Sequence, residues 1–168
     1  MNQVLYQSPE ARFSVSLPTP ILTGIYRLCH RAGAREVGGT LVGYYFRRNR
    51  CAAVTEASGP PVRSRMGRST FTRESVGLQV KLERWWNEGR YYLGEWHSHP
   101  SASPEPSSQD ATQMTAIAVS PAYSCPEPVL LIIGGNAGSG WCTSLTVFPK
   151  GEAPTSLFRV EPTAVVAA

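Results

Sequence analysis

Residues 95–110, EWHSHPSASPEPSSQD, restrict the possible folds more than any other stretch of the chain. His97 and His99 follow an apolar, aromatic run, and residues two apart on a strand point to the same face. The proline directly after them breaks that strand. Ser107 is a good N-cap, so a helix is expected to begin just after it and to carry Asp110 in its first turn. The sequence thus predicts a strand end joined by a short loop to a helix start.

These residues form a ligand set that suits zinc. Two of the chain's three histidines and its one aspartate lie here. Three protein ligands of the imidazole and carboxylate type leave a fourth position open, as in a catalytic zinc site, and bound zinc brings the pKa of water to about 7. We therefore predict a zinc site at His97, His99 and Asp110. The segment Ser107-x-x-Asp110 also matches a helix capping box, which needs no metal.

A zinc site of this kind needs a general base, and two glutamates are candidates. Glu95 shares the strand face of the histidines, but the rise of an extended strand places it about 13 Å from His99. Glu36 is distant in sequence, at the mouth of a strand that can lie beside the histidine strand. The residues alone leave both open. Ser107 also has two candidate roles, helix N-cap and hydroxyl donor to an oxyanion, which coexist only if its hydroxyl is shared.

The rest of the pattern predicts one domain, residues 1–168, in which helices alternate with strands. Apolar alternation or continuous apolar runs predict strands at 12–17, 40–46, 51–57, 70–72, 91–99, 129–133, 141–148 and 157–160. Helical spacing of apolar residues predicts helices at 21–32, 73–88 and 108–119. Residues 1–10 show no clear pattern. The order indicates an α/β or α+β sandwich.

Charge and hydropathy limit the partners and the compartment. The net charge is +4, and seven arginines lie between Arg47 and Arg73. Such a strip suits nucleic acid or an acidic protein, although a solvated loop is the commoner reading. No apolar run approaches the ~20 residues of a membrane span, and the start of the chain lacks a signal-peptide pattern. We expect a cytoplasmic protein with no membrane partner.

The spacing H-x-H-x7-S-x-x-D, with a glutamate upstream, resembles the JAMM motif of the MPN/JAB-domain zinc metalloproteases. These enzymes cut ubiquitin or ubiquitin-like modifiers from lysines. The resemblance implies that Glu36 is the general base, because it follows the first helix at the start of the next strand. It also implies that His97, His99 and Asp110 bind zinc and that Ser107 stabilises the tetrahedral intermediate. The implied fold is a cytidine-deaminase-like α/β sandwich, a curved mixed β-sheet flanked by helices.

The segment GEWHSHP and the small size of the chain resemble the prokaryotic JAB branch, and within it the stand-alone isopeptidases of bacterial CBASS anti-phage operons. That resemblance implies a protein substrate, either a ubiquitin-like modifier or a C-terminally conjugated CD-NTase, and E1/E2-like conjugation proteins as partners. The segments at 59–70 and 135–140, where related enzymes carry ubiquitin-gripping insertions, are short. Recognition is therefore expected to use other surfaces, with the Arg47–Arg73 region as one candidate.

Three other functions fit the sequence less well than a zinc peptidase. Some MPN domains have lost their ligands and act as non-catalytic scaffolds, but every ligand position is filled here. RadC-like proteins share a similar H-x-H-P…S-x-x-D segment, and a basic chain suits nucleic acid, yet the context of Glu36 and the GEWHSHP wording fit the peptidases better. Zinc deaminases need H-x-E and P-C-x-x-C, and neither occurs in this sequence.

Overall fold

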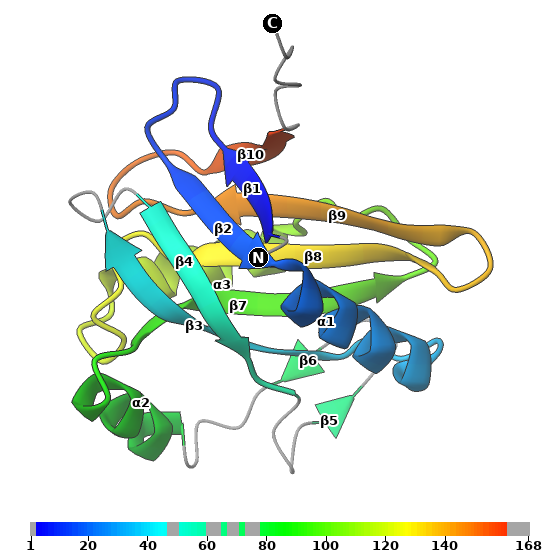
Figure 1. The fold of residues 1–168 in the computed structure, drawn as a ribbon, viewed down its shortest axis with the longest axis horizontal. Coiled ribbons are helices and arrows are strands. Elements are labelled where there is room, and N and C mark those ends of the chain that lie inside the picture. Colours follow the sequence, from blue (N-terminus) through cyan, green and yellow to red (C-terminus); the bar gives the residue numbers. More distant parts are fainter. Residues whose placement is uncertain (1–2, 47–50, 60–64, 67–70, 73–77, 161–168) are drawn as a thin grey trace, which may run out of the picture.

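The computed structural model describes residues 3–46, 51–59, 65–66, 71–72 and 78–160 (Figure 1). In chain order the elements are β1 (Gln3–Gln7), β2 (Ser14–Pro18), α1 (Thr19–Ala32), β3 (Gly38–Phe46), β4 (Cys51–Ala57), β5 (Arg65–Met66), β6 (Phe71–Thr72), α2 (Leu78–Asn87), β7 (Tyr91–Pro100), α3 (Ser108–Val119), β8 (Val129–Asn136), β9 (Gly140–Val147) and β10 (Thr155–Val160).

Eight of the strands form a closed barrel in the order β1-β10-β9-β8-β7-β3-β4-β2, while β5 and β6 form a separate two-stranded sheet. The sheet is mixed, because β2–β4 and β7–β8 are parallel and the other pairs are antiparallel. A mixed sheet with helices was predicted, and its closure was not. Strand β1 closes the barrel by pairing with both β2 and β10. Only Tyr6 of β1 is buried, so residues 1–10 lack the alternation that marks a strand.

Helix α1 forms where apolar residues recur at helical spacing. Pro18 is the N-cap residue, and a second proline stands in the first turn, where a missing N–H breaks no hydrogen bond. Leu22, Ile25 and Cys29 are buried against the sheet, which confirms the helix predicted at 21–32. Gly33 ends the helix at a φ of 63°, a left-handed conformation that glycine adopts without strain.

Hydrophobic clusters lie on the two faces of the sheet. In β8, Leu131 and Ile133 join the cluster that includes α1, whereas Leu130 and Ile132 join the cluster that includes Met114 of α3. This alternation is the period of two of a strand covered on both faces. Figure 1 shows α1 in front of the sheet and α3 behind it. The helices therefore flank the sheet as the sequence predicted.

Several predicted features lie wholly or partly outside the described residues. The strand predicted at 70–72 is represented by β6, and the helix predicted at 73–88 by α2, so Thr70 and residues 73–77 are not described. Most of the Arg47–Arg73 region, and most of the segment at 59–70, also fall outside the described ranges. The idea that the arginines contact substrate stays a prediction.

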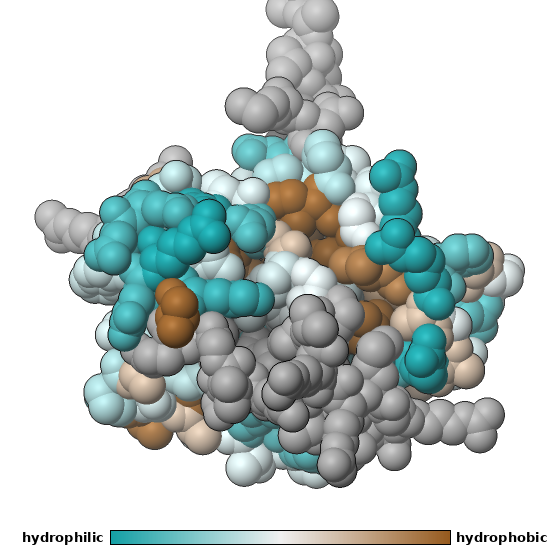
Figure 2. Space-filling view, turned by 90° about the horizontal axis from the view of Figure 1, so that it is seen from below, coloured by the Kyte–Doolittle hydropathy of each residue, from teal (hydrophilic) through white to brown (hydrophobic). Residues whose placement is uncertain are grey.

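The surface of the described residues mixes polar and apolar side chains. Seen from below, hydrophilic residues gather toward the two sides of the molecule, and hydrophobic residues lie together near its middle (Figure 2). Val80, Trp86 and Phe158 are among the large apolar side chains that are exposed. Within the described ranges, no helix is long and apolar enough to cross a membrane.

Candidate metal centre

Strand β7 brings the two predicted histidine ligands together near its end. It lies between β3, antiparallel, and β8, parallel, so its backbone is held on both sides. His97 and His99 project from the same face, and their Nε2 atoms are 3.0 Å apart. Both side chains are largely buried. The predicted convergence of the two imidazoles at one point is therefore present.

Helix α3 supplies the third predicted ligand from its first turn. Ser107 is the N-cap: its Oγ accepts a hydrogen bond from the backbone N–H of Asp110, and the Asp110 carboxylate accepts one from the backbone N–H of Ser107. The Ser107 hydroxyl also donates to Asp110 Oδ2, at 2.7 Å. Capping uses the lone pair of the hydroxyl oxygen, so it does not compete with donation by the O–H. Helix capping and oxyanion donation by Ser107 therefore conflict less than the sequence predicts.

Each imidazole Nε2 lies close to the Asp110 carboxylate, with the shorter distance running to a different carboxylate oxygen in each case. His97 Nε2 lies 3.3 Å from Asp110 Oδ1, and His99 Nε2 lies 3.7 Å from Asp110 Oδ2. Zinc bonds of about 2.0–2.1 Å place two ligands of a tetrahedron roughly 3.3 Å apart. These distances and the 3.0 Å between the two imidazoles centre on that value. The donor set therefore fits a metal ion of zinc's size and ligand preference.

The loop after β7 fixes the orientation of the second imidazole. Ser101 N–H donates to Gly135 of β8, and Gly135 N–H donates back to Ala102, at 2.8 and 3.0 Å. This anchored loop places the carbonyl oxygen of Ser103 3.1 Å from His99 Nδ1. A carbonyl only accepts, so the proton of a neutral imidazole lies on Nδ1 and the lone pair of Nε2 points into the cluster. His99 is thus held in the tautomer that a metal ligand needs.

Glycines let β3 approach the histidine strand closely. Gly38 pairs with His97, and a Cβ on Gly38 would lie 2.5 Å from the Trp96 carbonyl oxygen and 2.8 Å from His97 Cβ. A Cβ on Gly39 would lie 2.1 Å from the carbonyl oxygen of Ser58. No larger residue fits at either position without a backbone shift. Gly38 therefore allows the close approach of β3 to the strand that carries the histidines, and Gly39 allows the close approach of Ser58, just after β4.

Glu36 lies beside the cluster, two residues before β3 begins. The charges of His97, His99 and Asp110 all act on the Glu36 carboxyl, which therefore lies near these three side chains. Burial raises the pKa of the Glu36 carboxyl, His97 and His99 lower it, and Asp110 raises it. Burial also acts to raise the pKa of Asp110, but its hydrogen bond with His97, the charge of His97 and the Ser107 hydrogen bonds bring it well below the usual value. The four side chains thus share one electrostatic environment.

Glu95, the other candidate base, is buried and hydrogen-bonded between β7 and α3. It is only 4% exposed, and its two oxygens accept hydrogen bonds from Tyr92 Oη and Gln113 Nε2, at 3.1 and 2.7 Å. Gln113 lies on α3 three residues after Asp110. A bulge at Gly94, where φ is 149°, lets residues 92 and 95 face α3 together. Glu95 therefore fastens the helix that carries Asp110 to the strand that carries the histidines.

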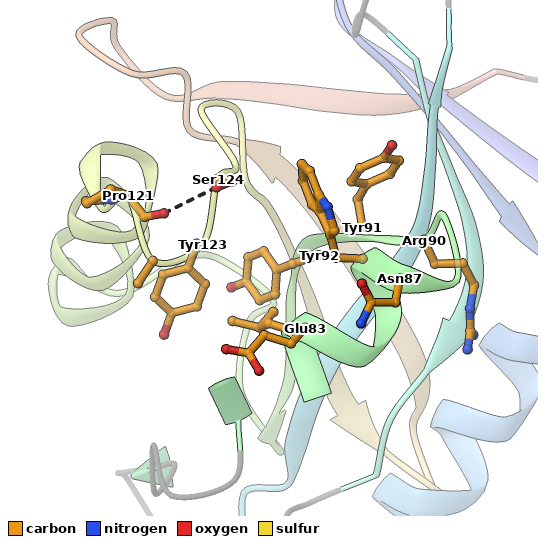
Figure 3. A pocket seen from close by; sticks show the side chains of 11 residues that line it. Glu83, Asn87, Arg90, Tyr91, Tyr92, Pro121, Tyr123 and Ser124 are labelled. Carbon is orange, nitrogen blue, oxygen red and sulfur yellow. Dashed lines mark hydrogen bonds between the residues drawn. The ribbon is translucent and has the colours of Figure 1, made fainter. Parts of the chain in front are cut away.

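A second concave region lies at the opposite end of β7 and was missed from the sequence. This aromatic pocket has a volume of about 450 Å³ and lies between α2, the start of β7 and the loop after α3 (Figure 3). Tyr92 and Tyr123 form one edge-to-face pair, and Trp86 and Tyr91 form another. The available signal was the doublets Trp85-Trp86 and Tyr91-Tyr92, because one ring of each doublet is buried and the other exposed.

Comparison with known proteins identifies the family. Residues 18–146 match the family described as prokaryotic homologs of the JAB domain. The chain belongs to this JAB family. It is 38% identical over 160 residues to the "CD-NTase/cGAS isopeptidase" of Enterobacter hormaechei subsp. hoffmannii (strain UCI 50). The alignment covers 95% of this chain and 89% of that protein. The prediction of a prokaryotic JAB protein resembling the CBASS isopeptidases is confirmed.

Two further relatives are more distant. The "CD-NTase/cGAS isopeptidase" of Escherichia coli (strain TW11681) is 31% identical over 66% of this chain and 68% of its own length. The "Probable metalloprotease y4qB" of Sinorhizobium fredii (strain NBRC 101917 / NGR234) is 29% identical over 71% of this chain and 75% of its own length. These JAB relatives support a hydrolase that cleaves peptide or isopeptide bonds.

The fold also resembles a solved structure. The solution structure of protein DSY2949 from Desulfitobacterium hafniense aligns with a TM-score of 0.58 at 16% identity, covering 85% of this chain and 87% of that one. At this identity the likeness concerns the fold alone.

Proposed function

We propose that this JAB protein is a zinc-dependent isopeptidase. Its substrate would be a ubiquitin-like modifier or a CD-NTase whose C-terminus is joined to a lysine of a target protein, and cleavage would release it during anti-phage defence in the cytoplasm. The observation that carries the proposal is the clustering of His97, His99 and Asp110, in which the two imidazole Nε2 atoms lie 3.0 Å apart and each within 3.7 Å of an Asp110 oxygen. The isopeptidase relatives support a protein substrate.

In this proposal the cluster holds the metal and leaves the chemistry of proton transfer to neighbouring side chains. The Nε2 atoms of His97 and His99 and a carboxylate oxygen of Asp110 would bind zinc. Zinc bound there supplies Lewis acidity, which polarises the scissile carbonyl and makes water more acidic. The buried setting keeps these interactions strong, because the local dielectric is low.

Glu36 is proposed as the general base. Its carboxyl is acted on by the charges of His97, His99 and Asp110, so it lies near the cluster without being one of the three clustered ligands. As water adds to the carbonyl carbon, Glu36 would take the water's proton. When the carbon–nitrogen bond breaks, it would pass that proton to the departing lysine amine. A raised pKa, caused mainly by burial, suits a group that must both accept and return a proton.

Ser107 is proposed to stabilise the oxyanion that forms on the substrate carbonyl. Its Oγ continues to cap α3 as an acceptor, so only the O–H must turn from Asp110 Oδ2 to the substrate. A single hydrogen-bond donor of this kind is worth about 10²–10³ in rate in other hydrolases. The helix cap would therefore hold a catalytic donor in place.

The test compares wild type with Glu36→Gln, using CD-NTase and ubiquitin each joined through the C-terminus to a lysine-containing reporter peptide. We expect wild type with zinc to cleave at least one conjugate and the chelator-treated protein to cleave neither. We expect Glu36→Gln to bind one zinc, measured by atomic absorption, and to lose activity by about 10²-fold or more. Wild-type activity in Glu36→Gln would contradict the proposed base, and activity in metal-free protein would contradict the zinc enzyme.

A further inference from the structure

Ser98, the residue between the two histidines, has no role in the proposed reaction. Successive side chains on a strand alternate, so Ser98 points to the face opposite His97 and His99. Its side chain is 1% exposed. A buried hydroxyl must find hydrogen-bond partners, and that of Ser98 finds one just before β3.

The Ser98 hydroxyl replaces a main-chain acceptor where β3 meets β7. Ser98 N–H donates to the Val37 carbonyl at 2.8 Å, as in an ordinary antiparallel pair. The reciprocal bond would run from Val37 N–H to the Ser98 carbonyl, but Val37 N–H donates instead to Ser98 Oγ, at 3.0 Å. The chain therefore leaves the regular ladder at this point, and the hydroxyl holds the departing peptide.

That peptide is the one that joins Glu36 to Val37. Val37 is 1% exposed, so its N–H has no water to replace the Ser98 hydroxyl. The Ser98 hydroxyl also acts on the thiol of Cys29 on α1, whose pKa it lowers. Burial is the larger effect and raises the pKa of this thiol to about 11, so Cys29 stays neutral.

We propose that Ser98 is a positioning residue, whose hydroxyl fixes the Glu36–Val37 peptide and thereby sets where the Glu36 carboxylate stands relative to the metal ligands. The proposal rests on the proposed role of Glu36. One strand then carries both functions: alternate side chains of β7 bind metal on one face and hold the base-bearing segment on the other. A small displacement of a catalytic group costs rate without changing how substrate binds.

The experiment uses Ser98→Ala, which removes the acceptor, and Ser98→Thr, which keeps a hydroxyl. Kinetics use whichever lysine-linked conjugate wild type cleaves. We expect Ser98→Ala to bind one zinc, to keep KM within about twofold, and to lose kcat by about 10–100-fold, the usual effect of removing a supporting hydrogen bond behind a metal site. Ser98→Thr should recover most of the lost kcat.

A second measurement does not depend on activity. In metal-free protein, amide hydrogen exchange followed by NMR should be at least about tenfold faster at Val37 in Ser98→Ala than in wild type. The matched control is Ser8→Ala, because buried Ser8 Oγ likewise accepts a backbone N–H, from Phe13 at 3.0 Å, in the connection between β1 and β2. Ser8→Ala should keep both kcat and Val37 exchange at wild-type values. Cys29→Ala, which spares the Val37 bond, should do the same.

The outcomes separate this inference from the proposed function. Full activity in Glu36→Gln would overturn the proposed base and Ser98 with it. An inactive Glu36→Gln beside a Ser98→Ala protein with wild-type kcat and Val37 exchange would overturn the Ser98 proposal alone. Loss of zinc from Ser98→Ala, or an equal loss of kcat in Cys29→Ala, would also overturn it. If Ser98→Ala does not fold, Ser98→Cys, which keeps a weaker acceptor of similar size, is measured in its place.

Discussion

The two ends of β7 are built in different ways. At its start, Tyr91 and Tyr92 border the aromatic pocket, where rings pack edge to face. At its end, His97 and His99 are oriented by hydrogen bonds and close packing from β3, the loop after β7 and α3. A polar group with fixed partners can hold an atom in place to a fraction of an ångström, whereas a pocket lined by aromatic rings offers shape and apolar area. We therefore assign chemistry only to the end of the strand.

The largest expected effect is loss of the metal at that end. His97→Ala removes one of the three proposed ligands and should abolish stoichiometric zinc binding, with activity falling about a thousandfold or more. Metal analysis and cleavage of a lysine-linked conjugate check this. His30→Ala is the matched control, because His30 is the chain's third histidine and is exposed on α1. Zinc binding that survives His97→Ala would remove the basis for treating the two ends differently.

The close approach of β3 to β7 gives the next largest effect. Gly38→Ala places a Cβ against the backbone of Trp96, so the strands must separate. We expect the free energy of unfolding to fall by about 1–3 kcal/mol, measured in urea, and activity to fall with it. Gly24→Ala is the matched control: Gly24 lies inside α1 with nothing within 4 Å of its Cβ position, so it should stabilise the protein by about 0.5–1 kcal/mol. A neutral Gly38→Ala would show that strand spacing does not set the site.

The clustering of the three candidate ligands could be predicted from the sequence because its signals are local. A strand places residues two apart on one face, a proline ends the strand, and Ser107-x-x-Asp110 begins a helix, so the positions of His97, His99 and Asp110 follow from short-range rules. The choice between Glu36 and Glu95 did not follow from such rules. It depends on β3 pairing with β7 across some sixty residues and on a bulge at Gly94, and neither leaves a local pattern.

Barrel closure and the aromatic pocket were missed for related reasons. Strand β1 has one buried residue, Tyr6, and its neighbours are β2 and β10 from opposite ends of the described chain. Hydrophobic alternation cannot reveal a strand that buries one side chain and is held mainly by backbone pairing with its two neighbours. The pocket requires α2, the start of β7 and the loop after α3 to meet, and the order of elements alone does not place them together.

Glu95 tests whether a buried carboxylate near the ligands contributes structure or chemistry. Glu95→Gln keeps the shape but weakens its hydrogen bonds with Tyr92 and Gln113. We expect a loss of about 1–2 kcal/mol in the free energy of unfolding. We also expect kcat within about threefold of wild type, because Glu95 holds α3 and transfers no proton. Thermal or urea unfolding beside the cleavage assay measures both, with Glu36→Gln as the converse control, stable and inactive. An inactive but fully stable Glu95→Gln would reverse the two assignments.

The smallest effect is expected at the start of β7. Trp86 is 60% exposed, and it forms an edge-to-face pair with Tyr91, with 5.3 Å between ring centroids. Trp86→Ala should therefore lower the free energy of unfolding by less than about 1 kcal/mol, and it should leave zinc content unchanged. On a short isopeptide reporter, too small to reach the pocket, kcat and KM should both match wild type. A tenfold fall in kcat on that reporter would mean that the aromatic end helps to hold the catalytic end, and the separation drawn between the two ends of β7 would fail.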